Sequence, residues 1–393
     1  MKQNKINKSR SSRRSQRRVE GCEHNKKSKL NKSGYILVLT LMILSVLVVV
    51  VTSMFFNETA HSALTKTIVD REKAKMLALG GLQLAISKLT IIPDKKSKEQ
   101  KEVKEQKEKK ETEPKGKEQA AEQKNEVKLL AKILPSLNRW QTVNLNEAND
   151  GINGTIKFSI SSENGKININ QLYDFSKHKF IGAGATTQFN AQKFLTDISA
   201  KIRDYAQKDI FRGLQQFLQN RKFPLNDVTE LLEIPEFAYF KDYVFYEPSS
   251  GEGKQKRPIF LTDIFTTWTS SYKLQPWVLS DSVSDLFGLN RSQAGDMENR
   301  KKLTEQGIKN FKPNIQWKTE WDKVLKPIYG REFNTLNKQI EFLFESQFGP
   351  KTFSVVSYGT VGDVTQRIFA IVEIVTSGNN EVAVVKIKKL YWI

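Results

Sequence analysis

The longest apolar run in the chain extends from Tyr35 to Phe56 and contains 22 residues without a charge. The polar side chains that interrupt it are Thr40, Ser45, Thr52 and Ser53. At about 1.5 Å of rise per residue, a helix of this length reaches roughly 33 Å, which is enough to cross the hydrocarbon core of a bilayer. The run is too long for the apolar part of a cleaved secretory signal. We therefore expect one membrane-spanning helix.

The helical pattern continues from Asn57 to Leu89, with no proline before Pro93. Apolar residues recur at spacings near three and four: Ala60, Ala63, Leu64, Ile68, Met76, Leu79, Leu82 and Ile86. This spacing predicts that the span continues outward as one long amphipathic helix. From Asp94 to Lys128 the composition changes to Lys, Glu and Gln with almost no apolar residue. Such a run cannot bury a core, so we expect a solvated linker or a lone charged helix.

The folded part of the chain is predicted to begin near Leu129 with strands. Alternation places Ile156, Phe158 and Ile160 on one face of a strand over Thr155 to Ile160. A second alternating run covers Lys166 to Asn170, and the Asn-Gly pair between the two runs predicts a hairpin.

Helical spacing replaces this alternation between about residues 190 and 345. The apolar residues that carry it form four groups: Phe194, Ile198, Ile202 and Tyr205; Ile210, Leu214, Phe217 and Leu218; Val283, Leu286 and Phe287; Leu336, Ile340, Leu343 and Phe344. Prolines at positions 224, 235, 276 and 313 mark the joints between short helices.

Strand signals return near the C-terminus in three runs, Thr352 to Gly359, Val364 to Val375 and Glu381 to Trp392. Turn-forming segments separate these runs. A helical block between two sets of strands indicates an α+β fold in which one sheet is interrupted by an insertion, rather than alternating βαβ units.

The distribution of charge along the chain predicts the orientation of the membrane-spanning helix. Of the formal net charge of +20, half lies in residues 1–34, which hold twelve basic and two acidic side chains. A buried core helix seldom follows such a segment, whereas a single-span anchor obeying the positive-inside rule does. We therefore expect the N-terminus in the cytoplasm and everything after Phe56 outside. The single cysteine, Cys22, is in the same segment, so a product without it could form no disulfide and no cysteine-ligated metal site.

The sequence holds little that indicates catalysis. His24, His61 and His178 cannot be grouped into a ligand cluster on sequence grounds, and a triad would have to depend on His178 alone. Gly182 and Gly184 lack the third glycine and the lysine of a phosphate loop, which favours a flexible turn.

Acidic and aromatic residues also favour structural roles. Asp281 and Asp285 are one helical turn apart and could meet a hard cation, but a solvated helix face is favoured. Four tryptophans near lysines suggest base stacking, although core or interface positions are favoured: Trp268, Trp277, Trp317 and Trp321. We expect no enzyme activity and no cofactor.

The junction of the basic segment with the apolar run, KSG followed by YILVLTLMIL, resembles the processing site of type IV prepilins and of the pseudopilins of type II secretion. The resemblance implies that prepilin peptidase cuts after Gly34 and that Tyr35 becomes the N-methylated first residue of the mature protein. Most such proteins carry glutamate at the fifth mature position, where this chain has Leu39. A missing glutamate is typical of the K-type minor pseudopilin, also called general secretion pathway protein K, at the tip of the pseudopilus.

Further stretches are similar to the K family, in the same order along the chain. KMLALGGLQLAISKL (75–89) is similar to its helix, ENGKININQL (163–172) to a motif after its first strands, and residues 352–375 to its closing sheet. FPLNDVTELLEIPEFAYFKDYVFYEP (223–248) resembles the end of a SAM-like helical unit, and LQPWVLSDSVSDLFGL (274–289) is a candidate for a second unit. The long leader, the charged linker and residues 291–345 depart from the family.

The resemblance implies six regions: a basic prepilin-type leader (1–34), a transmembrane and pilin-like helix (35–92), a charged linker (93–128), the first part of the sheet (129–175), a SAM-like helical insertion (176–345) and C-terminal strands (346–393). It further implies a structural subunit of the inner membrane with a periplasmic head. Its role would be to start or cap pseudopilus assembly during protein export.

The partners implied are other minor pseudopilins, the inner-membrane secretion machinery, prepilin peptidase, the inner membrane and, as a further option, the secreted substrate. Nucleic acid is not expected as a partner. Two alternatives stay open: a minor pilin of a type IV pilus or DNA-uptake system, and a membrane-anchored envelope enzyme. Processing after Gly34 favours the pilin-like classes, and an intact basic segment in the mature protein favours the enzyme.

Overall fold

The structure is a computed structural model that describes residues 32–90, 128–184, 188–247, 258–289, 309, 311–312, 314–376 and 383–393. The predicted charged linker, except its last residue 128, and most of the predicted leader lie outside these residues. Contacts divide the chain into two units, Met1–Thr65 and Lys66–Ile393.

The described part of the first unit belongs to helix α1 (Lys32–Leu89), which begins three residues before the apolar run. Within the described residues, α1 is the one helix long and apolar enough to cross a membrane, by its length and composition. Three of the four Ser and Thr hydroxyls in the run donate to carbonyls of their own helix: Thr40 to Leu37 (2.9 Å), Ser45 to Met42 (2.8 Å) and Thr52 to Val48 (2.6 Å). These bonds satisfy polar groups that lipid could not solvate.

The second unit is an α+β head. Its strands are β1 (Gln141–Leu145), β2 (Gly154–Ser162), β3 (Ile167–Asn168), β4 (Tyr173–Asp174), β5 (Lys179–Phe180), β6 (Phe265–Thr266), β7 (Thr352–Val361), β8 (Val364–Thr376) and β9 (Ala383–Trp392). Among the described residues, five of them form an antiparallel sheet in the order β1-β2-β7-β8-β9. The closing strands therefore pair with strands from the other side of the insertion, as the α+β prediction required.

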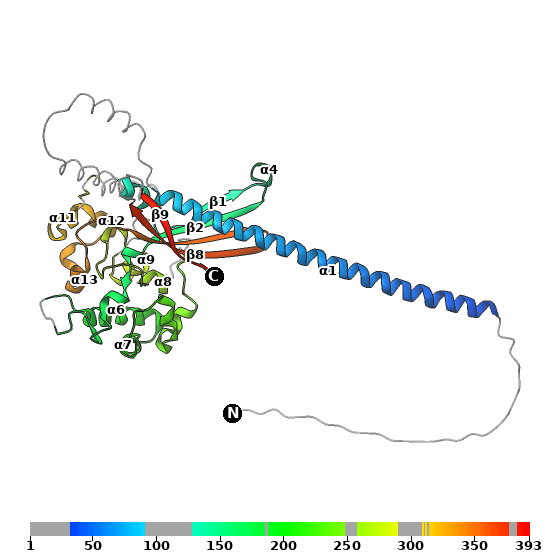
Figure 1. Ribbon diagram of the computed structural model, residues 1–393, viewed down its shortest axis with the longest axis horizontal. Helices are drawn as coiled ribbons and strands as arrows, with labels where there is room; N and C mark the ends of the chain where they lie inside the picture. The colour runs from blue at the N-terminus through cyan, green and yellow to red at the C-terminus, as the bar shows by residue number, and fades with distance from the viewer. Residues whose placement is uncertain are drawn as a thin grey trace, which may run out of the picture. The chain divides into compact units, whose positions relative to one another are not determined.

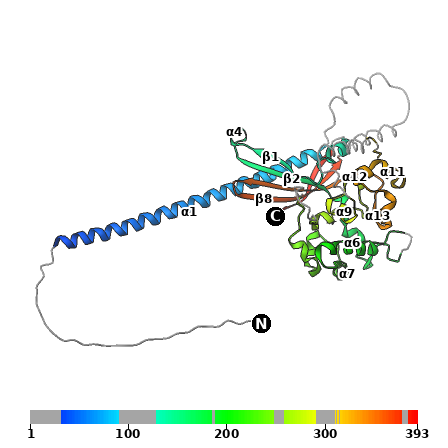
Figure 2. The same cartoon turned by 180° about the vertical axis from the view of Figure 1, so that it is seen from behind.

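The insertion consists of short helices. The α-helices after α1 are α4 (Glu147–Asp150), α5 (Ile169–Leu172), α6 (Ala191–Ala206), α7 (Phe211–Gln219), α8 (Leu261–Ile264), α9 (Asp281–Leu286), α11 (Trp317–Val324), α12 (Lys326–Tyr329) and α13 (Lys338–Leu343). The 3₁₀ helices are η1 (Glu163–Gly165), η2 (Val228–Glu233), η3 (Pro235–Lys241), η4 (Pro276–Val278) and η6 (Phe333–Thr335). Figures 1 and 2 show α6, α7, α11 and α13 in one helical body beside the sheet. The four groups of helical spacing fall on α6, α7, α9 and α13, which confirms that each region is helical, although Leu336 lies two residues before α13.

The predicted hairpin between Thr155–Ile160 and Lys166–Asn170 is wrong. Residues Glu163–Gly165 form the 3₁₀ turn η1, which takes the chain out of the sheet, and β3 pairs in parallel with the distant strand β6. The neighbours of β2 are β1 and β7. Gly165 lies against the insertion, because a Cβ there would be 2.0 Å from the carbonyl oxygen of Val278. Asn-Gly was a correct signal for a turn, but alternation does not specify which strand a segment pairs with.

Candidate functional site: the long helix, the motif after β2 and a pocket in the head

The predicted processing residues lie in the first turns of α1. Gly34 is the third residue of the helix, and Tyr35 and Leu39 are 66% and 45% exposed. Residues 1–31 of the predicted leader lie outside the described residues. The junction that carries the family resemblance is therefore helical at its C-terminal side, and among the described residues the side chains of Tyr35 and Leu39 are both exposed.

The last turns of α1 pack on the sheet through small residues. A Cβ on Gly359 of β7 would lie 2.1 Å from the carbonyl oxygen of Ala74, and a Cβ on Gly81 would lie 2.2 Å from Ser357 Oγ. Ser357 donates a hydrogen bond of 2.8 Å to the carbonyl oxygen of Ala78. The helix and the strand can approach this closely only because these positions carry little or no side chain.

The buried face of α1 differs from the one that large apolar residues indicated. The residues buried against the sheet are Ala74, Leu77, Ala78, Leu82, Ala85 and Leu89. Of the predicted set, Leu82 is in this face, whereas Met76 is 64% exposed and Leu79 is 39% exposed. Because close packing on Gly359 and Ser357 selects small side chains, the larger ones point away from the sheet. The result is an exposed apolar strip on the outer side of the head-docked helix.

The motif at residues 163–172 connects the sheet to the insertion. Glu163 and Lys166 form an ion pair in which both side chains are almost fully buried, and Lys166 also donates to Ser354 Oγ of β7 at 2.8 Å. Thr266 of β6 donates to the second oxygen of Glu163. A buried ion pair is tolerated when further hydrogen bonds complete it, and here the acceptor Ser354 comes from the sheet and the donor Thr266 from the insertion.

Two of the three asparagines of the motif, Asn168 and Asn170, complete this connection. Asn168 donates to the carbonyl oxygen of Thr269 at 2.6 Å and to its hydroxyl at 2.8 Å. Asn170 donates to the carbonyl of Leu225 and accepts from its amide, both at 2.8 Å. Asn168 and Asn170 thus attach segments of the insertion to the strand β3 and the helix α5. Their role in this chain is structural.

Asp281 and Asp285 are not equivalent. Asp285 is exposed, as expected of a solvated face, but Asp281 is half-buried and accepts hydrogen bonds from Tyr246 Oη (2.7 Å) and Asn138 Nδ2 (3.2 Å). For Asp281 the solvated-face interpretation is therefore wrong, because its segment packs on Asn138 and Tyr246, which lie far away in the sequence. No group of three His, Cys, Asp or Glu side chains that could hold a metal ion occurs in the described part of the chain.

Asp263 is a buried acid that sequence analysis did not single out. It is fully buried at the C-terminal half of α8, and its Oδ2 accepts from the amide of Ser282 at 2.7 Å. Burial raises the pKa of Asp263 to about 6, with Asp281 adding to the rise and Lys166 opposing it. No local pattern marks this residue, because its environment is assembled from α9 and the 163–172 motif.

The remaining candidates occupy structural positions. His61 is exposed on α1 and His178 is exposed in the turn between β4 and β5, while His24 lies outside the described residues. Gly182 and Gly184 adopt positive φ angles of 67° and 87° in a turn. Trp277, Trp317 and Trp321 are buried in the core, which confirms the core interpretation for these three.

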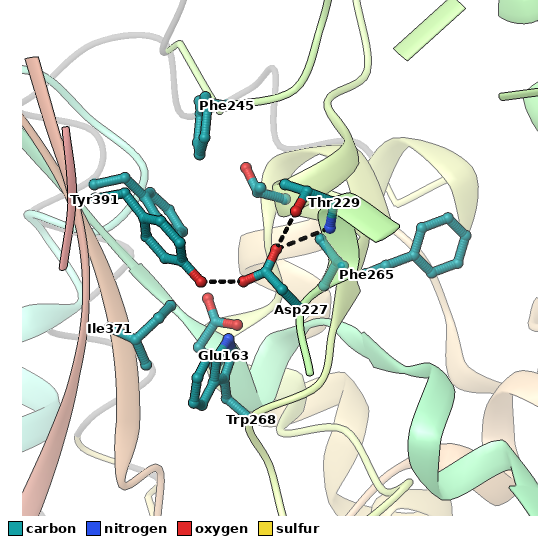
Figure 3. A pocket seen from close by; sticks show the side chains of 11 residues that line it. Glu163, Asp227, Thr229, Phe245, Phe265, Trp268, Ile371 and Tyr391 are labelled. Atoms are coloured by element: carbon teal, nitrogen blue, oxygen red, sulfur yellow. Dashed lines mark hydrogen bonds between the residues drawn. The ribbon is translucent and has the colours of Figure 1, made fainter. Parts of the chain in front are cut away.

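Trp268 is half-buried and lines a pocket of about 80 Å³ between the insertion and the sheet. The pocket also contains Asp227 of the η2 cap, Glu163, and Tyr391 of β9. Figure 3 shows the two carboxylates pointing into the same pocket, with the hydroxyl of Tyr391 directed at Asp227. These side chains come from four distant segments, so no sequence signal could have grouped them.

Comparisons with known proteins add a likeness among solved structures. No protein-family model matches the chain, and no curated protein sequence matches it. Among solved structures, it is similar to the crystal structure of the GspK-GspI-GspJ complex from the type 2 secretion system of enterotoxigenic Escherichia coli, with 12% sequence identity and a TM-score of 0.36. The alignment covers 76% of this chain and 99% of that one. At this TM-score the likeness carries no argument about function.

Proposed function

We propose that the chain is a K-type minor pseudopilin, a structural subunit that initiates or caps the pseudopilus of a type II secretion system. The observation that carries the proposal is the sequence Lys32-Ser33-Gly34-Tyr35 at the head of a charge-free apolar run, which α1 holds in one helix. Support also comes from the order of the head: a long helix, strands, a helical insertion, and closing strands that complete the sheet.

In this proposal, the apolar part of α1 anchors the protein in the inner membrane with its basic N-terminus in the cytoplasm and its head in the periplasm. The twelve basic residues before Tyr35 favour that orientation. Prepilin peptidase removes residues 1–34, and the new amino terminus at Tyr35 is methylated. The carbonyl-bonded hydroxyls of Thr40, Ser45 and Thr52 support placement of this stretch in lipid.

Other minor pseudopilins are the proposed partners, and the outer side of α1 is the proposed contact. Met76 and Leu79 are exposed there, and Ile68, at 61% exposure, lies about two turns before Met76 and about three turns before Leu79. Single exposed apolar residues are ordinary on a protein surface, but a strip along a helix supports packing against another helix.

The test is processing at Gly34. Prepilin peptidase acts at a residue without a Cβ, so Gly34→Leu should leave the full-length precursor in membranes of a host that carries the peptidase. Wild-type protein should begin at Tyr35. Gly21→Leu, a change of the same kind within the leader, is the matched control and should be processed normally. The mass and N-terminal residue of protein recovered from membranes are the measurements.

The same experiment separates the alternatives. Wild-type protein that still begins at Met1 would remove the main support for the pilin-like classes and favour a membrane-anchored envelope enzyme. If processing occurs, crosslinking in membranes identifies the neighbours. Crosslinks to pseudopilins support the secretion system, and crosslinks to pilins support a type IV pilus or DNA-uptake system.

A further inference from the structure

The pocket beside Trp268 has a buried floor and a half-buried rim. Glu163 and Phe265 are buried in its floor, whereas Asp227, Trp268 and Tyr391 are half-buried around its mouth. Its volume of about 80 Å³ equals that of two or three water molecules at roughly 30 Å³ each. Small-molecule sites usually measure about 300–1,000 Å³. The space therefore fits a functional group of a few atoms whose remainder lies outside the mouth.

Aromatic rings form much of the wall. The ring centroids of Phe245 and Phe369 are 5.1 Å apart, and those of Phe369 and Tyr391 are 6.0 Å apart. Trp268 lies below Asp227 in Figure 3. Aromatic faces attract cations through their quadrupole, and Trp and Tyr are the strongest of the three ring types in this respect.

The formal charge of the pocket is negative. Glu163 is balanced by its ion pair with Lys166. Asp227 accepts hydrogen bonds from neutral groups: the amide and hydroxyl of Thr229, both at 2.8 Å, the backbone amide of Glu230 in the capping box, and the hydroxyl of Tyr391. None of the ion pairs formed by the described residues includes Asp227. Lys389 Nζ lies 5.4 Å from the centroid of the Tyr391 ring, but none of these ion pairs joins it to Asp227. A carboxylate outside any of these ion pairs, beside the rings of Trp268, Phe245 and Phe369, is complementary to an organic cation.

We propose that this pocket binds the charged head group of one Lys or Arg side chain presented by a partner protein. The volume admits the head group and excludes a larger ligand, and the half-buried mouth allows the aliphatic stem to extend to the partner. The rings and Asp227 together supply the attraction. This inference is independent of the proposed function, because it depends only on the geometry of the pocket.

The test uses the full-length chain in dodecyl maltoside, labelled with 5-fluorotryptophan. Its ¹⁹F NMR spectrum is assigned for Trp268 with Trp268→Phe. The probes are n-butylammonium and methylguanidinium, with n-butanol as the neutral analogue, and the peptide acetyl-Gly-Lys-Gly-amide represents a partner side chain. Both cations and the peptide should shift the Trp268 resonance in a saturable manner, and n-butanol should not.

Three variants locate the effect. Asp227→Asn keeps a side-chain acceptor for the amide of Thr229 but removes the charge, and should weaken the affinity for n-butylammonium at least tenfold. Asp209→Asn is the matched control, because Asp209 also accepts a hydrogen bond from a backbone amide, that of Phe211, but lies away from the pocket. The affinity of this variant for n-butylammonium should equal that of the wild type. Tyr391→Phe removes a donor to Asp227 but keeps a ring, so binding should persist.

Equal shifts with n-butanol, or equal affinities in Asp227→Asn and Asp209→Asn, would overturn the proposal. Binding of free n-butylammonium without any binding of the peptide would show that the partner is not a protein side chain. If Asp227→Asn does not fold, judged by its thermal unfolding midpoint, Trp268→Leu decides: an unchanged affinity measured by calorimetry would contradict the role of the aromatic wall.

Discussion

At the scale of single residues, the head contains acids whose surroundings differ sharply. Glu163 is buried with Lys166 as its counter-ion, while Asp263 is fully buried and has the carboxylate of Asp281 near it. Because burial disfavours the charged form, the raised pKa of Asp263 means that its ionisation opposes folding. Ionisation of Asp263 therefore lowers the free energy of unfolding by an amount that depends on pH.

Asp263→Asn should remove this loss of stability, because asparagine does not ionise. Below about pH 4 the acid is protonated in both states and contributes no penalty. The penalty grows as pH rises from about 4 to about 6 and is constant above that, where it reaches about 3 kcal/mol at 1.36 kcal/mol per pKa unit. The variant should therefore gain stability relative to wild type between pH 4.5 and pH 7.5, measured by thermal unfolding of the protein in detergent. Asp363→Asn, at an exposed acid, should show no such gain; a constant difference for Asp263→Asn across this range would contradict the prediction.

Leu39 permits a second residue-scale prediction, which rests on the proposed function. A tip subunit has no subunit above it whose amino terminus could pair with a carboxylate at this position. A glutamate in the bilayer costs roughly 2.5–3.5 kcal/mol at the helix centre on insertion scales, and less near the interface. Leu39→Glu should bring no gain in assembly, measured by crosslinking to other pseudopilins in membranes, and Leu39→Gln controls for polarity without charge. If the Leu39→Glu variant assembled efficiently and repeatedly into the shaft, the expectation that the head confines the protein to the tip would be wrong.

At the scale of elements, the contact of α1 with the sheet depends on close approach. Gly80 and Gly81 are neighbours on the helix but face different surroundings: a Cβ on Gly80 would be 3.6 Å from the nearest atom, in Ile156, whereas on Gly81 it would be 2.2 Å from Ser357 Oγ. Replacement of glycine by alanine should therefore change the stability of the head in opposite directions at the two positions.

Gly80→Ala should stabilise the head by about 0.5–1 kcal/mol, because alanine is the better helix former and the added methyl group makes an ordinary contact. Gly81→Ala should destabilise it by about 1–3 kcal/mol, because Ser357 must give up its bond to Ala78 or the helix must move. The measurement is the thermal unfolding midpoint of each variant in the same detergent. A higher midpoint for Gly81→Ala would show that the helix and β7 are not in this close contact.

At the scale of the whole molecule, two long segments, the insertion and the predicted charged linker, separate parts of the sequence that nevertheless pack together in the head. The insertion separates β2 from β7, which nevertheless pair along eight registered positions from Thr155 to Ser162. The predicted charged linker separates α1 from residue 128, yet Lys132 donates to the carbonyl oxygens of Ser87 (3.1 Å) and Thr90 (2.8 Å). Leu130 and Ile133 are buried in the core at that point. The segments on either side of the linker are therefore held by contacts of their own.

Deletion of residues 94–128, joining Pro93 to Leu129, should leave the thermal unfolding midpoint of the protein within a few degrees of wild type. The linker has almost no apolar residue to bury, and the entropy of loop closure changes only slowly with length. Lys132→Ala in the deleted background tests the bridge to Ser87 and Thr90 and should lower the midpoint further. A fall of many degrees on deletion alone would mean that the linker packs against the head.

The sequence by itself determined the features that depend on local pattern. The apolar length of 35–56 predicted the candidate span, alternation placed Ile156, Phe158 and Ile160 on one face, and helical spacing located α6, α7, α9 and α13. The strands β7, β8 and β9 were also predicted, although β1 was not. These features could be read because periodic burial of side chains is imposed by the helix or strand itself.

Tertiary structure alone decided which surfaces meet. Ala74, Ala78 and Gly81 rather than the larger Met76 and Leu79 face the sheet, because the allowed distance is set by Gly359 and Ser357 on a strand almost 300 residues away. For the same reason the 163–172 motif forms a turn and a parallel pair instead of a hairpin. The pocket of Asp227, Trp268 and Tyr391 and the pKa of Asp263 likewise exist only where distant segments are brought together, and no local pattern encodes such distances.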